Sequence, residues 1–123
     1  MKIHPDVLHV QSIKAYGPGW VQVDDARLVN SVVITSLGRR FDWHCTRFEN
    51  LSCAHFEQLA DLQTELVIFG SGDRLRFPPA ALTRSLIERQ IGLETMDTAA
   101  ACRTYNILAA EGRQVAVALL LES

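Results

Sequence analysis

Apolar and polar positions alternate in twos along the first part of the chain, and glycines interrupt the alternation. Alternation of this kind is typical of short strands that bury one face. Residues 13–16 and the WVQV segment at 20–23 predict two strands joined by a turn at 17–19. Asp24-Asp25 then predicts the turn that ends this hairpin.

A second hairpin is predicted from the segment NSVVITSLGRRFDWHC. Residues 32–35 and 40–43 are expected to be its strands. The turn between them contains Gly38, which adopts a positive φ without steric cost. The two hairpins together predict a small β layer from the N-terminal half of the chain.

The pattern changes after the segment HCTRFENLSCAHFEQLADLQT, at 44–64. Phe56, Leu59 and Leu62 mark one side of a short predicted helix, and a strand, helix, strand, helix, strand order follows. ELVIFG, at 65–70, is a continuous apolar run that ends at glycine, which predicts a central strand covered on both faces. We expect the 66–95 unit to form a right-handed parallel crossover.

The segment FPPAALTRSLIERQIG predicts the crossover helix. Pro79 suits its first turn and Gly92 suits its C-terminal cap. The positions expected on its apolar face are Leu82, Leu86, Ile87 and Ile91, and those expected on its solvent face are Arg84, Ser85, Glu88 and Arg89.

Two further strands and a helix complete the predicted fold. LETM, at 93–96, predicts a short strand, Asp97 or Thr98 caps the next helix, and QVAVALLL, at 114–121, closes the sheet in a direction that the pattern leaves open. The fold class is therefore α/β. We expect residues 1–123 to form a single three-layer domain, with a mixed central sheet, helices from the C-terminal half and an extra β layer from the N-terminal half.

Composition is that of an ordinary globular protein: 123 residues, 48% hydrophobic, 21% charged and a formal net charge of -2. This charge gives no support to nucleic-acid binding. Basic pairs occur at Arg39-Arg40 and at Arg74 with Arg76, but acidic or apolar neighbours flank them, so they are interpreted as solvated surface. Oligomeric state stays open, with a homo-oligomer among the possibilities.

Cys45, Cys53 and Cys102 form an odd set without paired spacing, which favours a reducing, cytoplasmic compartment over a disulfide framework. The first twenty residues carry no signal-peptide pattern. The longest apolar run, 115–121, is far shorter than the roughly 20 residues that span a bilayer. We therefore expect no transmembrane segment.

Metal binding is not favoured. His44-Cys45 and Cys53-Ala54-His55 lack the two-residue spacer that is usual in structural zinc sites. Cys102 lies in an alanine-rich segment, which favours core packing over a reactive thiol. Neither a metal nor a cofactor is predicted.

The candidate chemistry lies in two loops that follow parallel strands, 70–73 and 96–98. Ligands bind at the carboxyl ends of such strands, and glycine lets backbone N–H groups approach an anion closely. The first loop is neither a GxGxxG motif nor a Walker loop, since it has no lysine. It is interpreted either as a structural turn or as a loop that binds a small anion.

The helix after the second loop carries polar residues among apolar ones. At 100° per residue, Arg103 and Asn106 share one side, while Tyr105 and Leu108 face the core. Arg103 must reach solvent, a bound anion or a carboxylate such as Asp73 or Glu111, and an internal ion pair is favoured. The candidate pocket residues are Gly70, Ser71, Gly72, Asp73, Met96, Thr98, Arg103 and Asn106.

The segments VIFGSGD, RFPP and ETMDTAAACRTYNILAAEGRQVAVALL resemble a family of domains of unknown function. This family includes mitochondrial complex I assembly factor 3 and small archaeal and bacterial proteins. The resemblance covers 65–120, is most specific at 96–115, and implies a three-layer α/β fold with an additional β layer. The motif positions it implies are Gly70, Gly72, Met96, Thr98, Ala101, Thr104, Asn106, Glu111, Gly112 and Arg113. Ser71 departs from the threonine that is more frequent in the family.

No catalytic residue follows from the resemblance, and no serine nucleophile elbow or histidine lies near the two loops. Gly112 and Arg113 suit a helix C-terminus, where glycine adopts the left-handed conformation and a cation faces the last carbonyls. The preferred hypothesis is a small soluble non-enzymatic domain that binds another protein and assists assembly of a respiratory membrane complex. The alternative is a small-ligand or anion-binding protein, or an enzyme, that uses the pocket between the two loops.

Overall fold

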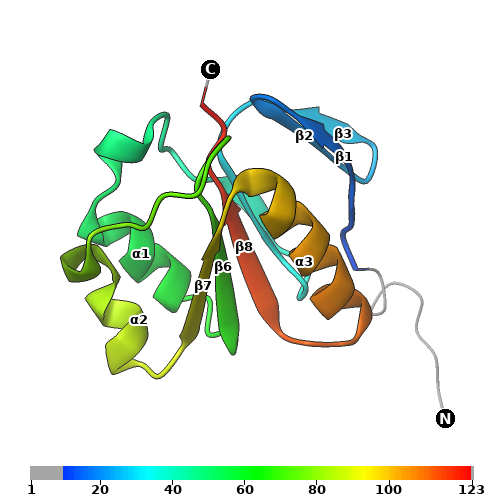
Figure 1. The fold of residues 1–123 in the computed structure, drawn as a ribbon. Coiled ribbons are helices and arrows are strands. Elements are labelled where there is room, and N and C mark those ends of the chain that lie inside the picture. The colour runs from blue at the N-terminus through cyan, green and yellow to red at the C-terminus, as the bar shows by residue number, and fades with distance from the viewer. Residues whose placement is uncertain (1–9, 123) are drawn as a thin grey trace, which may run out of the picture.

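The structure is a computed structural model that describes residues 10–122. Within them, five strands form a mixed central sheet in the order β5–β4–β8–β6–β7 (Figure 1). Their bounds are β4 (Val32–Thr35), β5 (Arg40–Asp42), β6 (Leu66–Gly70), β7 (Gly92–Met96) and β8 (Val115–Leu119). The last strand, β8, lies at the centre, antiparallel to β4 and parallel to β6, while β7 runs parallel to β6.

A second sheet is formed by β1 (Ile13–Gly17), β2 (Trp20–Val23) and β3 (Ala26–Leu28), all antiparallel. The first predicted hairpin is confirmed here. The second hairpin, β4 and β5, forms with Gly38 at φ 101° in its turn, but it joins the central sheet through β8 instead of the small β layer. The four residues of β4 are all buried, so this strand needs packing on both of its faces. A place in the central sheet provides that packing.

The helices divide between the two faces of the central sheet, as Figure 1 shows. The helices are α1 (Cys53–Ala60), α2 (Arg84–Glu88) and α3 (Thr98–Ala110), with short 3-10 turns η1 (Phe48–Asn50) and η2 (Ala80–Thr83). One core packs Phe56 and Leu86 against the face that carries Phe69. The other core joins Tyr105 of α3 and Val23 of the small sheet to the opposite face. The predicted α/β fold with three layers is confirmed.

The crossover segment departs from its prediction. Instead of one helix from Pro79, it forms η2 and then the short α2, and Gln90, with φ 58°, takes the left-handed position expected of Gly92. Gly92 begins β7, donating its N–H to the Glu65 carbonyl, and a Cβ there would lie 3.2 Å from Leu66 Cδ1. The shorter helix also leaves Ile87 69% exposed, off the apolar face on which it was expected.

The polar face of α2 also differs from expectation at Ser85. Its Oγ is buried and, among the described residues, has no hydrogen-bond partner. Leu86, in contrast, is fully buried as predicted.

Helix α3 begins and ends as predicted. The Asp97 carboxylate accepts a hydrogen bond from the Ala100 N–H at 2.8 Å, so Asp97 is the N-terminal cap. Gly112 has φ 83°, and the following Arg113 N–H donates to the Leu108 carbonyl. Tyr105 is fully buried and Leu108 packs against the same core.

Across residues 10–122, no helix has both the length and the apolar character that crossing a bilayer requires. The expectation about a signal peptide falls partly on residues 1–9, which lie outside the described residues.

Candidate functional site

The two candidate loops meet, as predicted, at the carboxyl ends of β6 and β7. The Ser71 N–H donates to the Met96 carbonyl and the Thr98 N–H to the Gly72 carbonyl, each at 2.8 Å. The Gly72 N–H donates to Thr98 Oγ1 at 2.9 Å, and that hydroxyl donates to the Leu120 carbonyl at 3.2 Å. The N–H groups of Ser71 and Gly72 are therefore occupied within the protein.

Gly70 allows the start of α3 to pack closely on β6. A Cβ at this position would lie 3.1 Å from the Ala101 Cβ and 3.2 Å from the Thr98 Cα. Contacts of 3.1 to 3.2 Å leave almost no room for a methyl group, so a larger residue would push the helix away. The Gly70 position is explained by this close helix–strand packing.

Ser71 and Arg76 brace the rest of the first loop. Ser71 is fully buried; its Oγ donates to the Arg74 carbonyl at 2.7 Å and accepts from the Arg76 N–H at 2.9 Å. The Arg76 guanidinium donates to the Ser71 carbonyl and, at 2.7 Å, to Glu122 Oε1. It also lies 4.6 Å from the centre of the Phe48 ring.

Glu122 completes this network from the other end of the chain. Its Oε2 accepts the Phe48 N–H at 2.7 Å. Burial alone would raise the pKa of the Glu122 carboxyl, but hydrogen bonds from Phe48 and Arg76 outweigh it, so the pKa lies below its usual value. No local sequence pattern signals this network, because its partners are 46 and 74 positions apart.

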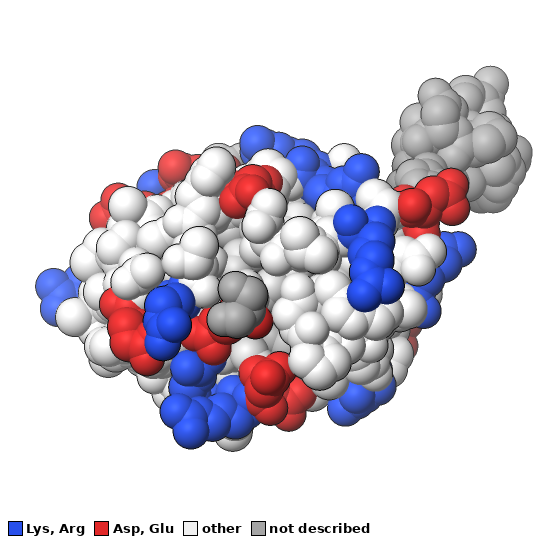
Figure 2. Space-filling model, turned by 90° about the horizontal axis from the view of Figure 1, so that it is seen from above, with Lys and Arg blue, Asp and Glu red and all other residues white. Residues whose placement is uncertain are grey.

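A hollow of about 360 Å³ lies beside the two loops. Tyr16 and the turn at 17–19 close it from the small sheet. Its remaining lining residues are Gly72, Asp73, Asp97, Thr98, Ala99, Leu120, Leu121 and Glu122. Three of these carry carboxylates and none carries a cation. Figure 2 views this end of the molecule and shows acidic and basic side chains interspersed with uncharged surface.

Arg103 does not line this hollow. Its Nη1 donates to the Tyr16 hydroxyl at 3.0 Å, and this hydrogen bond raises the pKa of the exposed guanidinium. The predicted ion pair with Asp73 or Glu111 is wrong, since Arg103 pairs with neither. The small sheet packs against the side of α3 that Arg103 occupies and offers it a hydroxyl there.

Asn106 also faces the small sheet, so its predicted place in the candidate pocket is wrong. Its Oδ1 accepts the Ile13 N–H and its Nδ2 donates to the Ile13 carbonyl, both at 2.8 Å. The Tyr105 hydroxyl donates to the neighbouring Gln11 carbonyl at 2.9 Å. The polar groups of α3 therefore hold the chain at the start of β1.

Glu111 and Arg113 lie at the other end of α3, and Thr104 lies in its middle. Arg113 Nε donates to Glu65 Oε1 at 2.6 Å, and this hydrogen bond lowers the pKa of the exposed Glu65 carboxyl. Glu111 is exposed at the end of the helix, and Thr104 is half-buried. These contacts join the end of α3 to the start of β6.

The cysteines and histidines of residues 10–122 do not converge on one point. Burial raises the pKa of the Cys102 thiol to about 12, and burial also raises the pKa of Cys45. His55 contacts Ser52 through Nδ1, and its Nε2 lies 3.1 Å from the His44 carbonyl oxygen. Within residues 10–122, no three histidine, cysteine or acidic side chains are grouped to hold a metal ion.

The fold and site define a class: small α/β proteins in which a three-stranded sheet and one long helix cover one face of a mixed sheet, and internal hydrogen bonds brace the strand-end loops. A family model described as "Protein of unknown function (DUF498/DUF598)" matches residues 13–120. The chain belongs to this family.

Its relatives include an assembly factor and bacterial proteins of known structure. The bovine (Bos taurus) NADH dehydrogenase [ubiquinone] 1 alpha subcomplex assembly factor 3 is 30% identical over 80 residues. That match covers 63% of this chain but only 44% of the bovine protein.

Two solved structures share the fold over nearly the whole chain. A crystal structure from Bordetella parapertussis has a TM-score of 0.86 and 35% identity, and covers 92% of this chain and 97% of its own. A solution structure from Bordetella pertussis, described as a Mth938-like domain, has a TM-score of 0.82 and 30% identity. That match covers 100% of this chain and 94% of the Bordetella pertussis chain.

Proposed function

We propose that this protein is a non-enzymatic protein-binding domain that assists assembly of a respiratory membrane complex. The observation that carries the proposal is the match to the bovine assembly factor, over 63% of this chain. The chain spans less than half the length of that relative, so the shared region is the domain to which the role is assigned. We also propose a reducing, cytoplasmic compartment, because Cys45, Cys53 and Cys102 form an odd set without paired spacing.

The contacts of the loops support this choice over the alternative. An anion site needs donors that face the ligand. The N–H groups of Ser71 and Gly72 are instead bonded to Met96 and Thr98, and Arg103 points to the small sheet. The hollow beside the loops is lined by carboxylates, which repel an anion. The hollow remains a candidate pocket for a small ligand that is neutral or positively charged.

The proposal is tested by affinity capture of the tagged full chain from its native cells in mild detergent. We expect subunits of the respiratory NADH dehydrogenase, or partly assembled forms of it, to be recovered with the chain. An unrelated tagged protein of similar size is the control. Efficient capture of the chain without any subunit of that complex would contradict the proposal.

A further inference from the structure

The outer edge of β7 is paired with no other strand within residues 10–122. The Gly92 N–H donates to the Glu65 carbonyl, just before β6, and the Met96 carbonyl accepts the Ser71 N–H, just after β6. Gly92 and Met96 therefore direct these backbone groups toward the β6 side of the strand. Because a strand alternates the direction of its backbone groups, the N–H and C=O groups of Leu93 and Thr95 point away from β6. They face outward, where no further strand of the described chain pairs with β7.

The opposite edge of the sheet is protected and the β7 edge is not. β5 has three residues, and two of them, Arg40 and Asp42, are charged. β7 has five residues, GLETM, with a single charge at Glu94 and neither lysine nor proline. Short length, charge and proline are the usual devices that keep an edge strand from pairing. β7 is the edge that can accept another strand.

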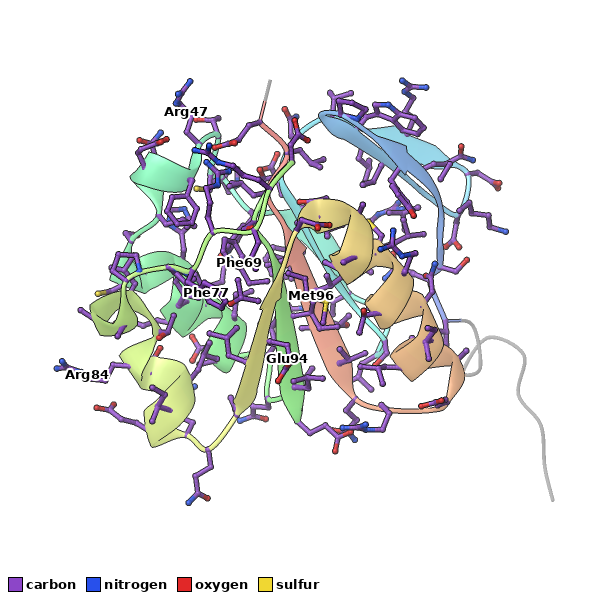
Figure 3. The ribbon with its side chains drawn as sticks, in the orientation of Figure 1. Arg47, Phe69, Phe77, Arg84, Glu94 and Met96 are labelled. Atoms are coloured by element: carbon purple, nitrogen blue, oxygen red, sulfur yellow. The ribbon has the colours of Figure 1, made fainter. Side chains whose placement is uncertain are left out.

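An apolar groove runs beside this edge on the side of α2. A hollow of about 480 Å³ is lined by Phe77, Pro78, Ala80, Thr83, Leu93, Glu94 and Thr95. Phe77 is 69% exposed, and the proline that follows it restricts its backbone to an extended conformation. Figure 3 shows Phe77 on the α2 side of β7, and Glu94 and Met96 along the strand.

We propose that β7 binds an extended segment of a protein partner as a sixth strand of the sheet, with an apolar side chain in the Phe77 groove and a lysine or arginine opposite Glu94. Backbone pairing at Leu93 and Thr95 supplies the affinity, and the groove and the carboxylate supply the specificity. The site rests on the proposed function, because it names the surface through which a protein-binding domain recognises its partner.

The charge of Glu94 selects a partner strand over a second copy of this chain. Glu94 is the middle residue of β7, between the outward-facing backbone groups of Leu93 and Thr95. An antiparallel pair of β7 strands that used both of these residues would place the two Glu94 side chains directly opposite each other. Like charges in that position are destabilising, whereas a basic residue is stabilising.

The site is tested by NMR with two synthetic peptides as probes and the uniformly ¹⁵N-labelled full chain. Each is a capped five-residue strand with threonine at both ends and valine on each side of a central residue, which is lysine in one peptide and glutamate in the other. We expect the lysine peptide to shift the amide signals of Leu93 and Thr95 and to bind about three- to tenfold more tightly than the glutamate peptide. The preference should reverse in Glu94→Lys.

The groove is tested with Phe77→Ala and a matched control. We expect Phe77→Ala to weaken binding of the lysine peptide by about tenfold or more, because it removes an exposed aromatic anchor. Ile87→Ala removes an apolar side chain of the same 69% exposure from α2, outside the groove, and should leave binding unchanged. Both residues are exposed, so the amide spectra should show that the fold is intact.

The outcomes separate this site from the proposed function. No shift at β7 with saturating lysine peptide, or equal binding of both peptides, overturns the site even if subunits are captured. Self-association through β7, seen as dimers by light scattering together with concentration-dependent shifts of the Leu93 and Thr95 amide signals, also overturns it. Peptide binding at β7 without capture of any respiratory subunit keeps the site and overturns the assembly role.

Discussion

Asn106 shows what a polar residue does on a mostly apolar helix of this protein. Its amide group accepts from and donates to the same residue, Ile13, as a neighbouring strand would. The small sheet therefore begins at a fixed point on α3. Its turn at 17–19 then lies across the hollow from the strand-end loops. At this position one side chain sets how the small sheet meets the main body.

Asn106→Leu should destabilise the protein by about 1–3 kcal/mol, because it leaves the Ile13 N–H and C=O groups without partners in a partly buried position. Urea denaturation followed by circular dichroism measures the loss. Ile107→Leu, at the exposed next position, is the control and should change the free energy of unfolding by less than about 0.5 kcal/mol. Equal stability of the Asn106 variant and the native protein would contradict the bracing role.

Glu122 gives the network around Arg76 a defined dependence on pH. A carboxyl whose pKa is lower in the folded state stabilises that state above its unfolded pKa, and this stabilisation is lost as pH falls through the folded pKa. We expect Glu122→Gln to reduce the free energy of unfolding by on the order of 1–3 kcal/mol at neutral pH. The difference from the native protein should shrink as the pH is lowered through the acidic range.

Denaturant titrations at a series of pH values test this dependence. Glu57→Gln, which changes an exposed carboxylate on α1, is the control and should have little effect at any pH. A stability difference for Glu122→Gln that is the same at neutral and acidic pH would show that the ionised carboxylate is not what stabilises the fold.

At the scale of elements, the loop after β6 is held by its glycine conformation and by Arg76 together. Gly72 has φ 104°, and a Cβ there would lie 2.6 Å from Arg76 Nη2. Arg76 cannot move without breaking its hydrogen bonds to Ser71 and Glu122. The loop, the guanidinium and the end of the chain form one unit.

Gly72→Ala should therefore destabilise the protein by about 2 kcal/mol more than Gly112→Ala, since displacing Arg76 disrupts charge-assisted hydrogen bonds. Gly112 is the matched control because it also has a positive φ, 83°, but no atom lies within 4 Å of the position that an added methyl group would take. Thermal unfolding of the two variants in parallel gives the comparison. Equal losses would mean that backbone conformation alone explains both glycines.

Local sequence patterns predicted most elements, because alternation, apolar runs and capping residues depend only on neighbouring positions in the chain. Alternation located the strands of both hairpins, the apolar run located β6, and Asp97 and Gly112 marked the ends of α3. The crossover helix was predicted too long, because nothing local shows that Gln90 must turn left-handed to deliver Gly92 to β7. Helical projection put Arg103 and Asn106 on one side correctly, but their partners lie 87 and 93 positions away.

For the whole molecule, the order of strands decides where the exposed and the braced regions lie. With β8 at the centre, the second hairpin fills one side of the sheet and β7 is left at the other edge. The braced loops lie at the carboxyl ends of β6 and β7, while the open edge and the Phe77 groove lie along β7 itself. Sequence patterns pointed to the loops because glycines are visible in a sequence, whereas an unpaired strand edge appears only when the sheet is assembled.

The most direct test of the assembly role is the amount of intact respiratory NADH dehydrogenase in membranes from native cells that lack this protein. Native gel electrophoresis with an in-gel NADH oxidation stain measures it, and a second respiratory complex is the internal control. We expect a loss of the intact complex, an accumulation of smaller forms that contain its subunits, and recovery when the full chain is restored. An unchanged amount of intact complex in cells without the protein would contradict the account.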